Sequence, residues 1–349
     1  MIIMKHITNK ADKIYPETYS IYNRLNSNEN RFFSKKKILL LGSDGFLGKS
    51  FLNYFKFLIK NKIYFQLDCV DNNISSFREK KNKNKFINYF CEDLNRFKKR
   101  KKYDIVIFLA GIASPTIYKK FPLEALEVSY LGAKKYLEYS KKDKSLFIFF
   151  SSSEIYGNPD LNNLPTSENY YGNVNSFGPR SCYDEGKRVG ETLCYIYKEY
   201  YKTKVKIIRP FNIYGPTMNS NDDRVIPRFI RAIKKNKPIT IYNHGKQTRS
   251  FCYITDAMVG FIKVISKGNL GDVYNVGNDK NEVSMNTLSN EIKKLYKKKV
   301  NIKKIKYPNF YPSNEPMRRC PDLKKIKKDI GFNPKETLKV SLLKFIKGF

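Results

Sequence analysis

The chain has 349 residues, of which 41% are hydrophobic and 15% aromatic, so it can bury the core of one large or two modest domains and is not disordered throughout. Its net charge is +35, but the lysines are spread along the chain without any finger, basic zipper or RNA-stacking motif, which argues against a nucleic-acid partner. With no apolar run near the ~18 residues of a membrane span and no CxxC pair among its six cysteines, we expect no membrane anchor, no metal site and a cytoplasmic location.

Taken in chain order, residues 1–34 carry no recognisable motif and are predicted to form an N-terminal extension. From residue 37, short apolar runs alternate with helical stretches, as in parallel strands that are buried on both faces and joined by crossover helices. The predicted strands are Ile38–Leu41, Ile63–Val70, Phe86–Phe90, Asp104–Leu109, Leu146–Phe150 and Val205–Ile208. The predicted helices between them include Phe46–Phe57, Pro122–Ser140 and Tyr183–Tyr201. This pattern predicts an α/β fold with a doubly wound parallel sheet.

Beyond residue 208 the regular alternation stops, which indicates a smaller C-terminal α/β region. We predict a first domain over residues 35–208, with a segment near 240–268 returning to it, and a second region over residues 209–239 and 269–349. The elements predicted after residue 208 are a helix at Val225–Lys235, strands at Ile239–Tyr242 and Val273–Val276, and amphipathic helical stretches after Pro321.

A glycine-rich turn follows the first predicted strand. Gly42, Gly45 and Gly48 have GxxGxxG spacing, and glycines at such a strand-to-helix junction let backbone N–H groups approach a pyrophosphate. Asp71 ends the second predicted strand, where a carboxylate accepts hydrogen bonds from an adenosine ribose and repels a 2′-phosphate. The pattern favours NAD, and NADP remains open because Arg78 lies close in the sequence.

A second group of residues is typical of hydride transfer. Tyr183 and Lys187 are four residues apart, so on a helix they share one face, where the ammonium group lowers the pKa of the phenol. Tyr-x-x-x-Lys alone is a weak signal in a chain so rich in both residues. It gains weight from the serines at 151–153, which follow a predicted strand at the edge where α/β sheets bind ligands.

These features, in this order and together with Arg209–Pro216, resemble the extended short-chain dehydrogenases that act on nucleotide sugars. The resemblance runs from about residue 36 to the C-terminus. Within the family, the segments Gly178–Arg188 and Ala113–Tyr118 are most similar to those of the UDP-glucuronate decarboxylases. The resemblance implies a Rossmann domain that binds NAD, a nucleotide-sugar-binding C-terminal region, and a homodimer paired through residues 122–140 and 183–201.

The same resemblance implies a reaction. Tyr183, supported by Lys187 and Ser152, would take the proton of the sugar 4-hydroxyl, and UDP-glucuronate would lose carbon dioxide through a 4-keto intermediate to give UDP-xylose. The cofactor contacts implied in this way are Gly42, Gly45, Phe46, Leu47, Gly48, Asp71, Asp93, Tyr183 and Lys187. The implied substrate contacts are Tyr118, Asn212, Arg224, Gln247, Arg249, Tyr253 and Arg319.

Three residues distinguish this reaction from its neighbours in the family. The resemblance implies that Ser153 and Glu154 manage water or proton delivery at C5, and that Arg319 pairs with the substrate carboxylate. The 4,6-dehydratases carry Asp-Glu where Ser153-Glu154 stands, and simple 4-epimerases usually lack that glutamate. The alternatives are a 4-epimerase or 4,6-dehydratase of this family and, in a different class, a non-catalytic protein that binds NAD or a polyanion.

Overall fold

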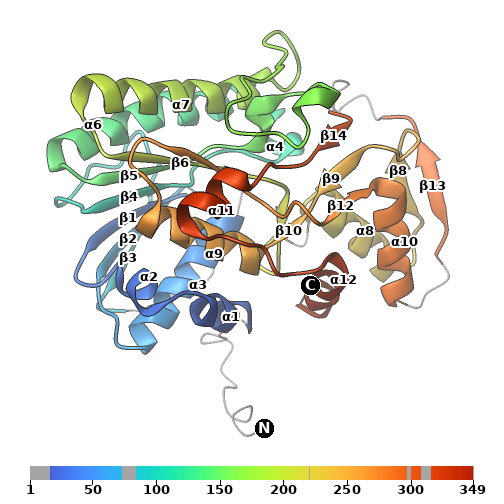
Figure 1. The fold of residues 1–349 in the computed structure, drawn as a ribbon, viewed down its shortest axis with the longest axis horizontal. Coiled ribbons are helices and arrows are strands. Elements are labelled where there is room, and N and C mark those ends of the chain that lie inside the picture. Colours follow the sequence, from blue (N-terminus) through green and yellow to red (C-terminus); the bar gives the residue numbers. More distant parts are fainter. Residues whose placement is uncertain (1–15, 73–83, 220, 297–299, 308–315, 349) are drawn as a thin grey trace, which may run out of the picture.

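Figure 1 shows the protein as a computed structural model, which describes residues 16–72, 84–219, 221–296, 300–307 and 316–348. A seven-stranded sheet runs through the larger part of the molecule, between layers of helices. Its strands are β1 (Lys37–Leu41), β2 (Gln66–Asp71), β3 (Ile87–Cys91), β4 (Ile105–Phe108), β5 (Leu146–Phe150), β6 (Val205–Pro210) and β11 (Val273–Val276). All are parallel, in the order β11-β6-β5-β4-β1-β2-β3, which confirms the predicted doubly wound sheet.

The sheet is buried on both faces. In β1, Ile38 and Leu40 pack into the core on one side, and Leu39 and Leu41 pack into the core on the other. Such a strand has to be apolar at every position, because successive side chains point to opposite faces. The continuous apolar runs in the sequence are therefore a direct consequence of the two helical layers.

Different helices cover the two faces (Figure 1). On one face lie α3 (Phe46–Lys60) and α9 (Ile254–Lys267). On the other lie α5 (Pro122–Glu127), the π-helical turn η2 (Val128–Gly132), α6 (Ala133–Asp143) and α7 (Ser181–Tyr201). The single helix predicted over residues 122–140 is thus two α-helices joined by a π-helical turn.

Two short connections near the carboxyl ends of the strands bear on the site. The helix α4 (Pro115–Tyr118) follows β4, and the 3₁₀ turn η3 (Ser153–Tyr156) follows β5. A further 3₁₀ turn, η4, covers Leu161–Asn163. These connections place side chains at the edge where parallel α/β sheets bind ligands.

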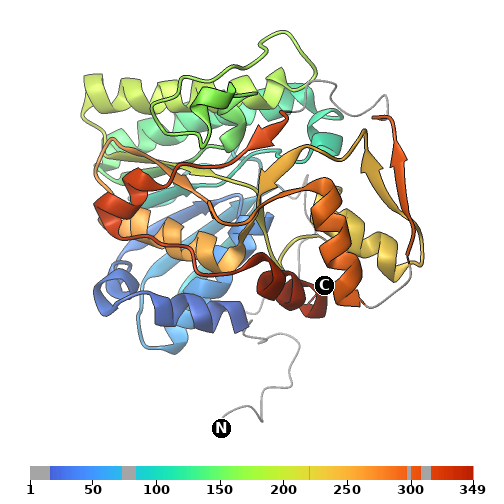
Figure 2. The same cartoon turned by 45° about the vertical axis from the view of Figure 1, so that its right-hand side comes forward.

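A smaller region lies beside the carboxyl ends of the sheet strands and comes forward in Figure 2. Its small sheets pair β8 with β13, β7 with β10, and β9 with both β12 and β14. The strands are β7 (Ile213–Tyr214), β8 (Ile239–Tyr242), β9 (Thr248–Ser250), β10 (Cys252–Tyr253), β12 (Glu282–Ser284), β13 (Ile302–Ile305) and β14 (Arg318–Arg319). The helices are α8 (Val225–Lys234), α10 (Met285–Tyr296) and α12 (Leu338–Gly348).

The predicted boundary of the second region needs a correction. We expected residues 269–349 to belong to it, but β11 joins the edge of the large sheet beside β6. The helix α11 (Lys324–Ile330) packs against β11 and α9 on the same large domain. A short apolar strand does not reveal in its own sequence which sheet it will join, so this membership was not predictable from the pattern.

The N-terminal segment also differs from the predicted extension. Residues 16–34 contain α1 (Pro16–Arg24) and α2 (Ser27–Arg31), which pack on α3 and α9. Ile21, Leu25 and Phe33 are buried in the main core. From residue 16 onward this segment is therefore an outer layer of the large domain.

One carboxylate fastens both ends of the described chain to α9. Asp256 is fully buried, and its Oδ1 accepts a hydrogen bond from Arg24 Nη2 at 2.6 Å. The backbone N–H groups of Lys335 and Glu336 donate to the same carboxylate, each at 2.9 Å. A buried carboxylate is stable only when it is paired in this way.

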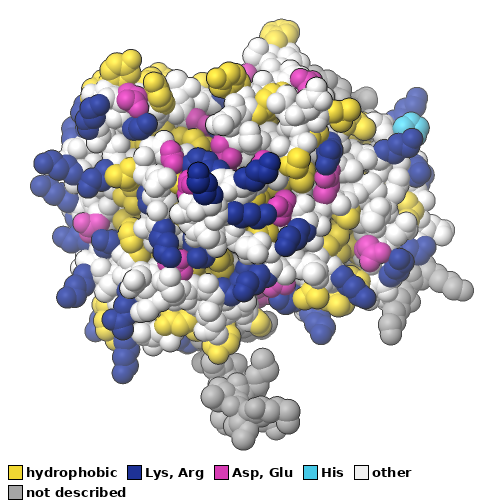
Figure 3. Space-filling model, viewed as in Figure 1, with side chains coloured by type: hydrophobic (Ala, Val, Ile, Leu, Met, Phe, Trp, Pro, Cys, Tyr) yellow, Lys and Arg dark blue, Asp and Glu magenta, His cyan; other side chains and the backbone are white. Residues whose placement is uncertain are grey.

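Charged side chains are spread over the surface. Lysines and arginines lie over the whole face seen in Figure 3, with acidic residues among them. Within the described residues, no helix is long and apolar enough to cross a membrane.

We predict that Asp256→Ala destabilises the fold by about 3 kcal/mol, because Arg24 and two backbone N–H groups lose their buried partner. Denaturant unfolding of the two proteins measures the difference. Glu291→Ala, which breaks a surface i,i+3 ion pair with Lys294, is the control and is expected to cost less than about 1 kcal/mol. Equal losses in the two variants would contradict the role given to Asp256.

Candidate active site

The glycine-rich turn brings three parts of the chain into contact. Gly42 has φ +84°, and a Cβ atom on it would lie 2.8 Å from the backbone nitrogen of Ala110, after β4. A Cβ atom on Gly48 would lie 2.1 Å from the carbonyl oxygen of Gly42. The first turn of α3 therefore packs directly on the end of β1, which leaves Gly45 at the helix N-terminus.

A groove opens beside this turn and contains four of the nine predicted cofactor contacts. Gly42, Gly45, Asp71 and Asp93 line it, together with Gly111 after β4. Asp71 accepts a hydrogen bond from the backbone N–H of Asp44 at 2.9 Å. Asp93 accepts one from the amide of Asn72 at 3.2 Å. Backbone held close by glycines, with carboxylates at the far end, fits a dinucleotide.

The other predicted cofactor residues lie at the start of α3. Phe46 and Leu47 are partly buried against the main core. The guanidinium group of Arg224 lies over the Phe46 ring, 5.4 Å from its centroid. Arg78, which kept NADP open, lies outside the described residues.

Helix α7 brings Tyr183 and Lys187 to the carboxyl end of β5. Lys187 is buried, and its Nζ donates a hydrogen bond to the carbonyl oxygen of Phe150 at 2.8 Å. The same nitrogen lies 5.9 Å from the centre of the Tyr183 ring and would lie 3.0 Å from a Cβ atom on Gly111. The Tyr-x-x-x-Lys pair is therefore in one place with Ser152, whose hydroxyl hydrogen-bonds to Tyr183.

Burial tunes both catalytic candidates. It lowers the pKa of the Lys187 ammonium to about 8. It also raises the pKa of the Tyr183 phenol to about 12, against the opposing effect of the hydrogen bond with Ser152. At neutral pH the Tyr183 phenol therefore carries its proton, and the neighbouring Lys187 ammonium is mostly charged.

Tyr118 contacts Tyr183. Its ring stacks on that of Tyr183, with centroids 5.8 Å apart and planes 9° from parallel. The Tyr118 hydroxyl is buried, and it has no hydrogen-bond partner within the described residues. The residue therefore fixes one side of the Tyr183 ring, and its contact with substrate stays a prediction.

Glu154 is the centre of the site's charges. Arg319 donates to it from both terminal nitrogens, at 2.5 Å to Oε1 and 2.7 Å to Oε2. Arg180 donates to the same Oε2 from Nη2. Burial works against ionisation, but the positive charges of Arg180, Arg319 and Arg249 lower the pKa of Glu154 to about 2. The carboxylate is therefore charged at neutral pH and bound between guanidinium groups.

Sequence reasoning missed Asp184 and the role of Arg180. Arg180 Nε donates to Asp184 Oδ2 at 3.3 Å, one turn along α7. Burial and the nearby charge of Glu154 raise the pKa of Asp184 to about 7. The signal was available in the sequence, because an arginine four residues before an aspartate on a helix is a common ion pair.

Three of the remaining predicted substrate residues lie at or near the centre of the site. Arg249 on β9 is the register partner of Arg319 on β14, so both lie beside Glu154. The positive charge of Arg224 lowers the pKa of the Tyr183 phenol, while its guanidinium group forms an ion pair with Asp222. Asn212, at φ +43°, donates to the carbonyl of Ser250 at 3.3 Å.

Gln247 and Tyr253 lie further from the centre of the site. Gln247 is buried at the start of β9 and donates to the carbonyl oxygen of Tyr242 at 3.4 Å. Tyr253 is fully buried, and its hydroxyl donates to Glu17 of α1 at 2.7 Å, on the opposite side of the molecule from α7 (Figure 1). Tyr253 belongs to β10 and packs in the main core, and its contact with the substrate stays a prediction.

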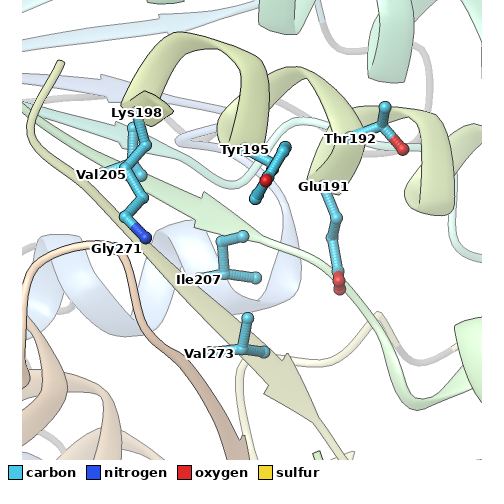
Figure 4. Close-up of a pocket in the computed structure, with 8 residues that line it drawn as sticks. All are labelled: Glu191, Thr192, Tyr195, Lys198, Val205, Ile207, Gly271 and Val273. Carbon is cyan, nitrogen blue, oxygen red and sulfur yellow. The ribbon is translucent and has the colours of Figure 1, made fainter. Parts of the chain in front are cut away.

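A second hollow lies away from this chemistry. Figure 4 shows it between α7 and the strands β6 and β11, lined by Tyr195, Ile207 and Val273 among others. Glu191, on its wall, pairs with Arg209 at 2.6 Å. None of the predicted site residues lines this hollow.

Comparison with known proteins gives the family. The model of the NAD dependent epimerase/dehydratase family matches residues 38–277. UDP-glucuronic acid decarboxylase 6 of Arabidopsis thaliana is 34% identical over 319 residues, which cover 90% of this chain and 89% of that protein. The chain belongs to the NAD dependent epimerase/dehydratase family, and its cofactor is NAD.

Two solved structures share the fold. An epimerase from Methanothermobacter thermautotrophicus is 20% identical, with a TM-score of 0.80 over 96% of each chain. UDP-glucuronic acid 4-epimerase from Bacillus cereus, solved with UDP-glucuronic acid and NAD, is 24% identical, with a TM-score of 0.74 over 89% of this chain and 98% of that one. These likenesses extend the family's architecture over nearly the whole chain.

We predict that Glu154→Gln lowers the free energy of unfolding by about 3 kcal/mol at pH 7, because it removes a buried charge from two arginines. The pKa of Glu154 is about 2 in the folded chain and 4.5 ordinarily. Its charge therefore stabilises the fold above pH 4.5, and this contribution disappears as the pH falls toward 2. Denaturant unfolding at pH 7, 5 and 3 should show the two proteins converging; a constant gap would contradict the assignment.

Proposed function

We propose that the chain converts UDP-glucuronate to UDP-xylose by NAD-dependent decarboxylation through a 4-keto intermediate. One observation carries the proposal: Arg319, in the same site as Tyr183, already holds a carboxylate with two hydrogen bonds. This fork geometry is how arginine recognises carboxylates, and the substrate's C6 is one. The decarboxylase relatives, similar over nine-tenths of the chain, support the same reaction.

The first step is removal of a proton from the sugar 4-hydroxyl. Tyr183 first gives up its own proton to solvent, and the buried Lys187 ammonium and a hydrogen bond from Ser152 stabilise the phenolate that results. The phenolate oxygen then takes the proton of the 4-hydroxyl. NAD bound in the groove supplies the hydride acceptor for C4 and the hydride donor for the return step. Because Gly42 and Gly111 both line that groove, the cofactor reaches the catalytic pair from the glycine-rich turn.

The second step breaks the C5–C6 bond. A ketone at C4 lies β to the carboxylate, so carbon dioxide leaves as the bonding electrons flow into the carbonyl. Tyr183, now carrying the proton, and Ser152 donate hydrogen bonds to the developing oxyanion. Ser153 and Glu154 then manage delivery of a proton to C5, and reduction at C4 gives the product.

A 4-epimerase acting on the same substrate is the second candidate. The Bacillus cereus relative is named for that activity, and an arginine fork for the carboxylate would serve it equally. Epimerisation leaves C6 in place and changes only C4. The two reactions are therefore separated by the mass of the product.

The test of the proposal is incubation of the purified protein with UDP-glucuronate and NAD, followed by mass spectrometry and NADH absorbance. A nucleotide sugar that has lost carbon dioxide, without lasting NADH, is the expected result. Product of unchanged mass with altered C4 configuration would establish the epimerase. Unaltered UDP-glucuronate with folded, NAD-bound protein would exclude both.

We predict that Tyr183→Phe lowers kcat by at least about 1,000-fold, because the hydroxyl that takes the substrate proton is lost. NAD binding, measured by calorimetry, should remain. Tyr200→Phe is the control, since Tyr200 lies on the same helix with 75% of its surface exposed. Comparable losses in the two variants would point to damage to α7 rather than to chemistry.

We also propose a cytoplasmic homodimer paired through α5, η2 and α7. All six cysteines, each within the described residues, are free thiols, as is usual in a reducing compartment. Large apolar side chains are exposed along these elements, at Leu123, Leu126, Tyr130, Leu131 and Tyr195. Burial of such a strip in a symmetric contact would remove it from water.

Leu131→Asp should therefore convert the dimer to a monomer, because it places a charge in the proposed contact. Light scattering after size-exclusion chromatography gives the mass. Leu161→Asp, at a residue 79% exposed on η4, is the control and should leave the mass unchanged. A wild-type protein of monomer mass at micromolar concentration would end this proposal.

A further inference from the structure

The Glu154 carboxylate has two guanidinium partners with different surroundings. Arg319 reaches it from β14 with both terminal nitrogens. Arg180 precedes α7 and donates to Oε2 from its Nη2. The two arginines therefore share Oε2.

The proposed substrate brings a second carboxylate to the same arginine. Each terminal nitrogen of Arg319 donates one of its two hydrogens to Glu154, and within the described residues the Nε has no hydrogen-bond partner, so Arg319 has donors left for a second carboxylate. Its side chain is only 5% exposed, so Glu154 and the substrate carboxylate would share one buried guanidinium group. Two carboxylates at one arginine repel each other, which favours the loss of Glu154 from its place.

Arg180 is placed to prevent that loss. It already contacts Glu154 Oε2, and its side chain is 11% exposed. Its Nε donates a hydrogen bond to Asp184, which follows Tyr183 on α7. The position of Arg180 is thus set by the same helix that carries the catalytic tyrosine.

Asp184 has a feature that a simple surface ion pair would lack. Its side chain is 7% exposed, and within the described residues its Oδ1 has no hydrogen-bond partner. A buried carboxylate with one oxygen unsatisfied is costly to the fold. Its retention beside Arg180 is explained if the pair serves the site rather than stability.

We propose that Asp184 and Arg180 form a positioning pair that keeps Glu154 in place when the substrate carboxylate shares Arg319. Arg180 acts through Glu154 and does not itself bind the substrate. The proposal rests on the proposed function, since it assigns the residue that lets two carboxylates share Arg319. The step that depends on it comes after oxidation at C4, because Glu154 is assigned to C5.

The experiment compares Arg180→Gln with wild type in UDP-glucuronate binding, kcat and enzyme-bound NADH. We expect the dissociation constant to change less than about 3-fold and kcat to fall about 100-fold, the loss typical of a residue that orients a catalytic group. NADH should accumulate during turnover, because oxidation by Tyr183 proceeds while the later step slows. Arg180→Lys should recover part of kcat, and the kcat of Asp184→Asn should lie between the values for Arg180→Gln and wild type.

Lys325→Gln is the matched control. It breaks an i,i+4 ion pair with Asp329 on α11, outside the site, and should leave all three readings unchanged. If Arg180→Gln weakens binding as much as kcat, Arg180 binds the substrate carboxylate itself and the proposal is wrong. If kcat stays within about 3-fold of wild type, or falls without any NADH accumulating, Arg180 does not position Glu154 for the later step.

The failure of the proposed function would look different. Wild type that releases no carbon dioxide from UDP-glucuronate would remove the reaction on which the inference rests. Wild type that releases it while Arg180→Gln matches it would leave the decarboxylase assignment in place and overturn the inference alone. Arg180→Lys provides a second reading if the glutamine variant fails to fold.

Discussion

A single buried carboxylate holds the two regions of the protein together at the site. Glu154 follows β5 of the large sheet, Arg180 precedes α7, and Arg319 comes from β14, 165 residues further along the chain than Glu154. None of the three charges can be buried without the others. The C-terminal region is therefore fixed against the edge of the sheet where the catalytic tyrosine lies, and it forms one wall of the site.

The same burial that fixes the carboxylate sets the acid–base chemistry. The interior lowers the pKa of Lys187 and raises that of Tyr183, so near neutral pH a protonated phenol lies beside an ammonium group that is mostly charged. Oxidation at C4 is the common step of the family, and the groups around C5 decide which product forms from the 4-ketone. In the proposed reaction those groups are a serine, a glutamate and Arg319, and position 153 carries a serine where the 4,6-dehydratases have an aspartate.

Much of the architecture was predictable because it depends on local patterns. The strand at 146–150 and the helix α8 were found within one residue, since continuous apolar runs and helical periodicity are properties of the segment itself. The membership of β11 in the large sheet and the packing of α1 are decided by distant parts of the chain. The site shows the same division. Tyr183 and Lys187 are recognisable in the sequence from their spacing. The burial of Tyr253 against α1 and the pairing of Arg319 with Glu154 arise only in the folded molecule.

The carboxylate of Asp256 has a consequence for how the chain acquires its structure during synthesis. Arg24, 232 residues upstream, waits for α9 to leave the ribosome, and the N–H groups of residues 335 and 336 come up to 80 residues later still. Until then a charge that ends up fully buried has to stay in contact with water. The contacts around Asp256 are therefore complete only once residues 335 and 336 are available, and a chain that stops before residue 335 lacks two of the donors that the buried carboxylate needs.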